Sequence, residues 1–313
     1  MTKLQKILVA YDGSPHSKEA LHWAVYLSRH SGAAVTAVKV FEPFLTESRW
    51  KEVGVLPDSF APFETLQNKD HQLMQAVKEF GHTHGVEITT EVLNGKAAET
   101  LLDYAQKHAI DMIITGNRGH GTIKQLLVGS VTRHLVSLAH VPVMVVKNCP
   151  VVNFTGGSLI MATLRNILVA YDGSPHSKKS LAWALELARP DNAQITVLKV
   201  REPYELSMFY NIPESGSMGA AAKMMAELKE KEVAETAMMN EAKALGDKVG
   251  INVIPLILDG NATEVLIEYS QKHGFDLIIA GARGHGIFDR LPLGTVAHNL
   301  VNVSPVPVLV VKI

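Results

Sequence analysis

A twelve-residue segment that occurs twice is the strongest constraint on what this chain can fold into. Ile7–Lys18 and Ile167–Lys178 both read ILVAYDGSPHSK. A second segment, Gly116–Gly121 (GNRGHG), returns as Gly281–Gly286 (GARGHG). The first repeat has an offset of 160 residues and the second an offset of 165, so five extra residues fall in the middle of the second half. A duplicated sequence predicts two domains of one kind.

The joint between the halves is marked by its composition. The stretch after Asn148 contains Pro150, Gly156, Gly157 and Ser158, which are residues typical of a linker. We therefore predict a first domain at residues 1–148, a linker at 149–163 and a second domain at 164–313. The length of 313 residues agrees with two domains.

Apolar runs alternate with segments of helical periodicity in each half. Lys6–Tyr11 is an apolar run bounded by Asp-Gly-Ser, which is typical of a strand buried on both faces. Ser14-Pro15 then predicts a helix start, with apolar residues at helical spacing as far as Arg29. The further strands expected in the first half are 34–41, 86–93, 111–115 and 141–147, and the further helices are 65–85, 97–107 and 130–139. This order predicts a parallel sheet with helices on both faces.

The second half follows the same plan but differs in its middle. Ala220–Leu245 is rich in Ala, Glu, Lys and Met and predicts one long helix. We interpret its methionines as filling a core or an interface. They are Met224, Met225, Met238 and Met239.

The loops after the first and fourth strands should flank the point where strand order reverses, which is where such sheets bind ligands. After the fourth strand the first half reads Gly-x2-Gly-x9-Gly-Ser, and the second half reads Gly-x2-Gly-x9-Gly-Thr. Glycines allow a ligand to approach peptide N–H groups closely, and a helix N-terminus favours a phosphate. A single Gly-x-x-Gly is often only a turn, and Ser or Thr before a helix is often only an N-cap. The same spacing in both halves favours the phosphate interpretation.

These segments resemble the universal stress protein family. The glycine pattern is similar to that family's ATP-binding signature, and Ile-Leu-Val-Ala-Tyr-Asp-Gly-Ser is similar to its first strand. The resemblance covers nearly the whole chain, twice. It implies two tandem Rossmann-like domains of the adenine nucleotide alpha hydrolase-like kind. Each would be a five-stranded parallel sheet of order 3-2-1-4-5.

The resemblance also implies which residues hold ATP. Asp12 and Asp172 match the acid that contacts the nucleoside. Val40 and Val200 match the residue whose backbone meets the adenine. The phosphate loops would be Gly116, Gly119, Gly129 and Ser130, and Gly281, Gly284, Gly294 and Thr295.

Other side chains near these motifs have less specific interpretations. Arg118 and Arg283 lie inside the glycine loops and suit phosphate geometry. His120 and His285 are interpreted as solvated loop residues, and His16 and His176 as first-turn surface residues. Gly95 and Gly260 are expected to serve turns at the edge of the nucleotide site.

Three functions of different classes follow. The first is an ATP-binding stress-response protein whose nucleotide occupancy, with Mg²⁺, regulates conformation or assembly. The second is a slow Mg-dependent ATPase or AMP-forming nucleotide hydrolase, in which Asp12 and Arg118 would act. The third is a nucleotide-free interaction protein whose glycines only form turns. The first is favoured because the sequence has the full phosphate loop but neither Walker A, nor GxGxxG, nor an evident nucleophile–base pair. We predict no catalytic set and no metal site.

Composition and charge limit the partners and the compartment. The net charge of −1 offers no basic footprint for nucleic acid, and the single cysteine, Cys149, fits a reducing compartment. The apolar run near the N-terminus is too short for a signal peptide or a membrane span, so we expect a cytoplasmic protein. The resemblance implies dimer contacts through last strands such as 143–147 and 308–312. We therefore expect an internal pseudo-dimer of the two halves, a possible homodimer through the Met-rich helix, and a protein partner of unknown identity.

Overall fold

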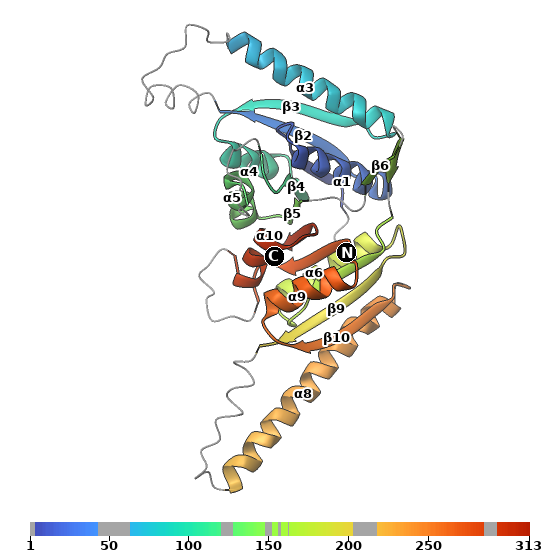
Figure 1. Cartoon of the computed structure of the whole chain (residues 1–313), viewed down its shortest axis with the longest axis vertical. Coiled ribbons are helices and arrows are strands. Elements are labelled where there is room, and N and C mark those ends of the chain that lie inside the picture. Colours follow the sequence, from blue (N-terminus) through green and yellow to red (C-terminus); the bar gives the residue numbers. More distant parts are fainter. Residues whose placement is uncertain are drawn as a thin grey trace, which may run out of the picture. The chain divides into compact units, whose positions relative to one another are not determined.

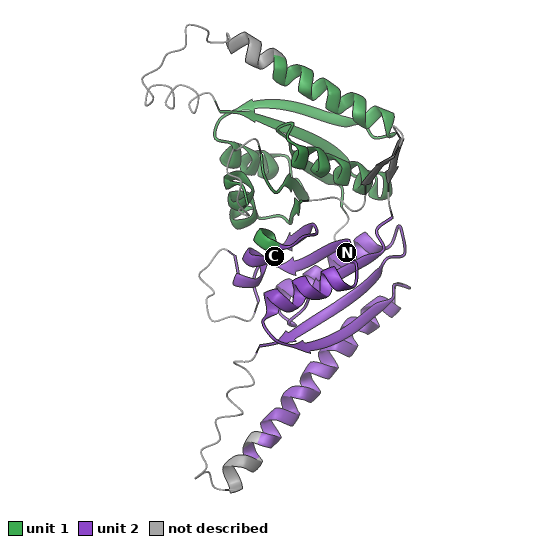
Figure 2. Ribbon diagram, in the orientation of Figure 1, with its two compact units in different colours: residues 1–161, 301–303, 312 green, residues 162–300, 304–311, 313 purple. Residues whose placement is uncertain are grey.

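The computed structural model describes residues 4–42, 63–119, 128–147, 152–155, 158–161, 163–202, 218–284 and 293–313. The chain divides into two compact units, whose main spans are Met1–Met161 and Ala162–Leu300 (Figure 2). Each unit is an α/β domain with the same order of elements (Figure 1).

The first unit is a parallel sheet of five strands. Its strands are β1 (Lys6–Ala10), β2 (Ala34–Phe41), β3 (Ile88–Asn94), β4 (Met112–Gly116) and β5 (Val143–Val146). β1 pairs with both β2 and β4, β2 also pairs with β3, and β4 also pairs with β5. The order is therefore β3-β2-β1-β4-β5, and the predicted order 3-2-1-4-5 is confirmed.

Four described helices cover this sheet. They are α1 (Pro15–Ser31), α3 (Phe63–Thr83), α4 (Ala97–Lys107) and α5 (Ser130–Leu138). α1 packs on the central strands and α3 on β2 and β3, whereas α4 and α5 pack against each other. Right-handed crossovers place α4 and α5 on the sheet face opposite α1 and α3. Between these layers the central strand β4 and its neighbour β5 are buried along their whole length, whereas most of the edge strand β3 is partly exposed.

Local sequence explains where the first helix begins and ends. Ser14 is the N-cap of α1 and accepts the Ser17 N–H at 3.3 Å, while Pro15 takes the first helical position. Gly32 ends the helix with a left-handed φ of 72°. On the buried face of α1, Trp23 is 1% exposed, which anchors the helix on the sheet.

The second unit repeats this plan. Its strands are β8 (Asn166–Ala170), β9 (Gln194–Arg201), β10 (Val253–Asp259), β11 (Leu277–Gly281) and β12 (Val308–Val311). Parallel pairing gives the order β10-β9-β8-β11-β12. Its described helices are α6 (Pro175–Ala188), α8 (Met218–Asp247), α9 (Ala262–Lys272) and α10 (Thr295–Val303).

The long helix expected in the second half is present as α8, which has 30 residues where α3 has 21. Its methionines do not all share one environment. Met239 is buried in the core, but Met225 is 74% exposed. Met239 is therefore a core residue, as expected, whereas Met225 is not in the core and its expected place in an interface stays a prediction.

The linker between the domains contains two short strands. β6 (Val152–Thr155) and β7 (Ser158–Met161) pair antiparallel. Linker composition alone did not indicate this hairpin.

Candidate functional site

The reversal of strand order places two loops at one end of the first sheet. The chain leaves β1 toward β2 and leaves β4 toward β5, so its crossovers run in opposite directions. Ala10 pairs in register with Thr115, so the residues that follow each strand lie next to each other. Ligands bind at such switch points in open α/β sheets.

The loop after β1 is held by hydrogen bonds of Asp12. One carboxylate oxygen of Asp12 accepts the Ser14 N–H at 3.0 Å, and the Asp12 N–H donates to the Ser17 hydroxyl at 3.4 Å. Gly13 between them has a φ of 84°, a conformation that favours glycine. The Ser14 hydroxyl donates to the Arg118 carbonyl at 3.2 Å, which joins this loop to the glycine loop.

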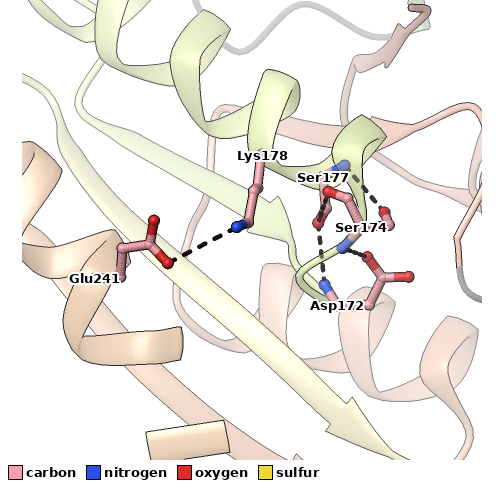
Figure 3. A network of polar contacts seen from close by, with 5 residues as sticks. All are labelled: Asp172, Ser174, Ser177, Lys178 and Glu241. Atoms are coloured by element: carbon pink, nitrogen blue, oxygen red, sulfur yellow. Dashed lines mark hydrogen bonds and ion pairs between the residues drawn. The ribbon is translucent and has the colours of Figure 1, made fainter. Parts of the chain in front are cut away.

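The second domain builds the same arrangement (Figure 3). Asp172 accepts the Ser174 N–H at 3.0 Å, and Ser174 accepts the Ser177 N–H at 3.2 Å. Beside it, Lys178 of α6 and Glu241 of α8 form an exposed ion pair at 3.8 Å, which contributes little to stability.

Two of the glycines in the first loop are required by close packing within the protein. A Cβ at Gly116 would lie 2.7 Å from the carbonyl carbon and the Cβ of His16, in the first turn of α1. A Cβ at Gly119 would overlap a carboxylate oxygen of Asp12. The equivalent glycines of the second domain, Gly281 and Gly284, face His176 and Asp172 in the same way.

Gly129 differs from these two glycines. A Cβ there would meet its nearest neighbour, the Asn117 carbonyl oxygen, at 3.5 Å, which is an ordinary contact, and its φ of −58° suits any residue. Gly294 has the same open surroundings, with a nearest distance of 3.4 Å. Packing within the described residues therefore does not explain why glycine stands at either position.

Each of these glycines also begins a helix. Gly129 is the N-cap of α5 and Gly294 that of α10, and neither helix start has a side-chain cap. The N–H of Gly129 donates to the Asn117 carbonyl at 2.9 Å and closes the base of the loop. Ser130 and Thr295, the first helical residues, are exposed. The first N–H groups of a helix and its dipole attract an anion to this position.

A cavity of about 530 Å³ lies over these loops in the first domain. All seven residues that the sequence predicts for the first site line it: Asp12, Val40, Gly116, Arg118, Gly119, Gly129 and Ser130. Its floor is the ends of β1, β2 and β4, and its far wall is the first turn of α5. The structure therefore brings these seven residues together, while their role in binding remains a prediction.

Sequence reasoning missed several residues of the cavity. They include Glu42, Thr115, Thr132 and Arg133. Arg133 follows Ser130 by three residues, so helical spacing from the glycine motif was the signal that could have identified it. Glu42 follows β2 and its carboxylate accepts the Ala97 N–H at 2.5 Å, at the start of α4. Because β2 and α4 are distant in the sequence, no local pattern could have indicated this contact.

Burial and the positive charge of Arg118 govern the titration of nearby groups. Burial, and after it Arg118, lowers the pKa of His16 from its ordinary value of 6.5. The same two causes lower the pKa of Lys147, which follows β5, to about 8. Burial, and after it the Asp12 carboxylate, raises the pKa of Tyr11. Burial is therefore the largest cause of all three pKa shifts, and the charges that add to it are Arg118 for His16 and Lys147, and Asp12 for Tyr11.

The predicted residues of the second site lie at equivalent places. Asp172 and Gly284 are in close approach, and Gly294 N–H donates to the Ala282 carbonyl at 2.7 Å, as Gly129 does in the first domain. Val200 lies near the end of β9, paired with Leu258. Arg283 is exposed between the two glycines.

The remaining sequence interpretations have mixed outcomes. Gly95 and Gly260 have φ values of 146° and 142°, so their turns require glycine, and Gly95 does not line the cavity. His16 lies in the first turn of α1 and is partly exposed, with its backbone and Cβ close to Gly116. His120 and His285 lie outside the described residues.

The described residues contain neither a metal-binding cluster nor a helix that could span a membrane. In the ranges that the structure describes, no group of three or more His, Cys, Asp or Glu side chains could hold a metal ion. None of the described helices combines the length and the apolar character needed to cross a membrane.

Comparison with known families gives one match that covers nearly the whole chain. The model of the universal stress protein family matches residues 3–147 and again residues 163–312. A universal stress protein of Mycolicibacterium smegmatis is 25% identical over 312 residues, which cover 98% of this chain and 96% of that protein. Universal stress protein MJ0531 of Methanocaldococcus jannaschii is 31% identical over 148 residues, which cover 46% of this chain and 82% of that protein.

Solved structures show the same fold. A universal stress protein of Archaeoglobus fulgidus aligns over 99% of both chains with a TM-score of 0.67 and 18% sequence identity. A protein of Pseudomonas aeruginosa described as functionally unknown covers 99% of this chain with a TM-score of 0.63 and 15% identity. At these identities the likeness concerns the fold alone.

Proposed function

The chain belongs to the universal stress protein family, with two tandem domains, and we propose that each domain binds ATP and that occupancy regulates its conformation or assembly in a stress response. The observation that carries this proposal concerns the surroundings of Gly129 and Gly294 within the described residues. There a Cβ would meet its nearest neighbour only at ordinary contact distance, 3.5 and 3.4 Å, yet glycine is present at both helix starts. An arriving phosphate supplies the reason, because a side chain at this position would occupy the space that the anion needs.

The lining of the first cavity fits the parts of a nucleotide. Its volume of about 530 Å³ lies within the range of small-molecule sites. Asp12 would accept hydrogen bonds from ribose hydroxyls, and the backbone of Val40 would meet the adenine. The N–H groups at the start of α5, with Ser130 and Arg118, would hold the phosphates. Mg²⁺ would accompany the triphosphate and neutralise part of its charge.

A slow hydrolase is the competing function. Asp12 and Arg118 line the same cavity, and a carboxylate near a phosphate-binding arginine could support Mg-assisted hydrolysis. Turnover of radiolabelled ATP, reduced at least tenfold in Asp12→Ala, would favour this alternative. Turnover no faster than a control without protein would exclude it.

We also propose the arrangement and the location of the chain. The proposed boundaries are residues 1–148 and 164–313, joined by residues 149–163. The two domains would pack as an internal pseudo-dimer through their last strands, and the Met-rich α8 could add a homodimer contact. We propose a cytoplasmic protein with no membrane or nucleic-acid partner. Solution scattering would contradict the pseudo-dimer if the data required two separated domains.

The nucleotide carried by freshly purified protein tests the proposed function. The protein is denatured, and the released nucleotide is separated and quantified by chromatography. We expect ATP as the main species. A content of mostly ADP or AMP would favour the hydrolase. If no nucleotide is released and calorimetry with ATP and Mg²⁺ detects no binding, the glycine loops only form turns and the protein is an interaction protein without nucleotide.

A further inference from the structure

The two domains differ at the floor of their sites. In the first domain, Thr132 of α5 donates its hydroxyl to the Gly116 carbonyl at 2.7 Å. The Thr115 hydroxyl lies 3.3 Å from the Thr132 hydroxyl and 3.3 Å from the same carbonyl. Both threonines are buried and line the cavity. These contacts fix the start of the glycine loop to the helix that would receive the phosphates.

The second domain has alanines at both positions. Ala280 is the next-to-last residue of β11, as Thr115 is of β4, and Ala297 takes the place of Thr132, with the same offset of 165 residues. Both alanines are buried, at 2% and 1% exposure. An alanine has no hydroxyl to donate, so the connection that Thr132 makes to Gly116 has no counterpart from Ala297 to Gly281.

The wall of each site differs as well. Arg133 is the fourth residue of α5, is exposed and lines the first cavity. The fourth residue of α10 is His298, which is also exposed and whose Nδ1 lies 3.4 Å from the Asn299 side-chain oxygen. The two helix starts have the same backbone hydrogen bond. The N–H of Arg133 donates to the Gly129 carbonyl at 3.0 Å, and the N–H of His298 donates to the Gly294 carbonyl at 2.9 Å. The two side chains therefore leave equivalent points of the helix.

Arginine and histidine offer different groups to a phosphate. A guanidinium carries a permanent charge and five donors in a planar fork, whereas an imidazole carries two ring nitrogens. With Arg118, the first site has two guanidinium groups on its lining.

We infer that the two sites are unequal and that the first binds a nucleoside triphosphate more tightly, because Arg133 and the pair Thr115–Thr132 complete it. The second site, with His298, Ala280 and Ala297, is the weaker one. This inference rests on the proposed function, since it concerns the same two ATP sites. With unequal affinities, the first site fills at a lower ATP concentration than the second. Over the range between these two concentrations, each chain holds one nucleotide.

Reciprocal substitutions in the full chain test the inference. Calorimetric titration of the wild type with Mg²⁺ and ATP should give two classes of site. Arg133→His should weaken the tighter class about five- to tenfold, and His298→Arg should strengthen the weaker class by a similar factor. Both residues are exposed, so thermal unfolding should remain unchanged and serve as the folding control.

Adenosine is the matched ligand control, because it lacks the phosphates that Arg133 would contact. Neither substitution should change adenosine affinity by more than about twofold. Two wild-type sites of equal ATP affinity, or an ATP affinity that Arg133→His leaves unchanged, would overturn the inference while the proposed function stands. Absence of any ATP binding by the wild type would overturn both.

Discussion

The three glycines of each loop have two different tasks. Gly116 and Gly119 allow the loop to approach α1 and Asp12, whereas a Cβ at Gly129 would make only ordinary contacts with the described residues. The sequence presents them as one motif, because spacing carries no information about what surrounds each residue. Only the structure separates the glycines that the fold needs from the glycine that a ligand would need.

Gly116→Ala should destabilise the first domain. The added Cβ would meet the backbone of His16 at 2.7 Å, and a backbone contact cannot rotate away as a side chain can. We expect a loss of about 1–3 kcal/mol in the free energy of unfolding, measured by denaturant titration. A variant as stable as the wild type would show that this packing is looser than the structure indicates.

Gly129→Asp should instead leave the fold intact and weaken ATP binding at the first site alone. Asp is a preferred N-cap residue, and the φ and ψ of Gly129, −58° and 153°, suit it. Stability should therefore change by less than about 0.5 kcal/mol, while the carboxylate should lower ATP affinity at the first site at least tenfold by repulsion. Gly294→Asp is the matched variant for the second site. Unchanged ATP affinity in both variants would contradict the proposed position of the phosphates.

The His16 imidazole should hold its proton less strongly than an ordinary histidine. Burial is the main cause and the Arg118 charge the second, so an NMR titration should place its pKa below 6.5. Because the unfolded chain then binds more protons near this pH, His16 lowers stability as the pH falls below about 6.5. In Arg118→Gln the pKa should rise, because the second-largest cause that lowers it is removed. A pKa that does not move would show that Arg118 does not act on this group.

At the scale of elements, the two repeats differ in how they satisfy the free N–H groups at the start of one helix. α9 is capped by its own residue, since the Asn261 side chain accepts the N–H groups of Thr263 and Glu264 at 3.0 and 3.2 Å. The equivalent helix α4 has Lys96 at its N-cap, without a side-chain cap. There the Glu42 carboxylate, which arrives from the end of β2, accepts the Ala97 N–H.

Lys96→Asn transfers the cap of the second repeat to the first and should stabilise it. The backbone at Lys96, with φ −78° and ψ 121°, is close to that at Asn261, with −72° and 124°. We expect a gain of about 0.5–1 kcal/mol, read as an increase in the unfolding temperature. Asn261→Ala should cost a similar amount in the second domain. A destabilising Lys96→Asn would indicate that the Glu42 contact already satisfies this helix start.

Elements with a strong local signal could be predicted from the sequence. The buried strands, the Ser14-Pro15 helix start and the long helix in the second half are each encoded within a few neighbouring residues, and the structure confirms them. The hairpin at residues 152–161 and the Glu42 contact were missed. The first lies in a segment whose composition is that of a linker, and the second joins residues that are far apart in the sequence.

At the scale of the whole molecule, duplication gives each chain two copies of one loop arrangement. The seven residues proposed for the first site line one cavity, and their role in binding stays a prediction. The glycine spacing and the strand order indicated the two loops, whereas Val40 followed only from the family resemblance. The sequence did not indicate that the copies differ, since Thr132 and Ala297 are unremarkable residues in a helix. The difference matters because the Thr132 hydroxyl donates a hydrogen bond to the Gly116 carbonyl, which an alanine cannot do.

Equilibrium dialysis with radiolabelled ATP and Mg²⁺ tests the central claim most directly, because it counts the sites in the intact chain. The wild type should approach two ATP per chain at saturation, Gly129→Asp and Gly294→Asp should each approach one, and the double variant should retain none. Thermal unfolding of all four proteins controls for the fold. A wild type that binds no ATP, or a double variant that binds as much as the wild type, would contradict ATP binding at the glycine loops.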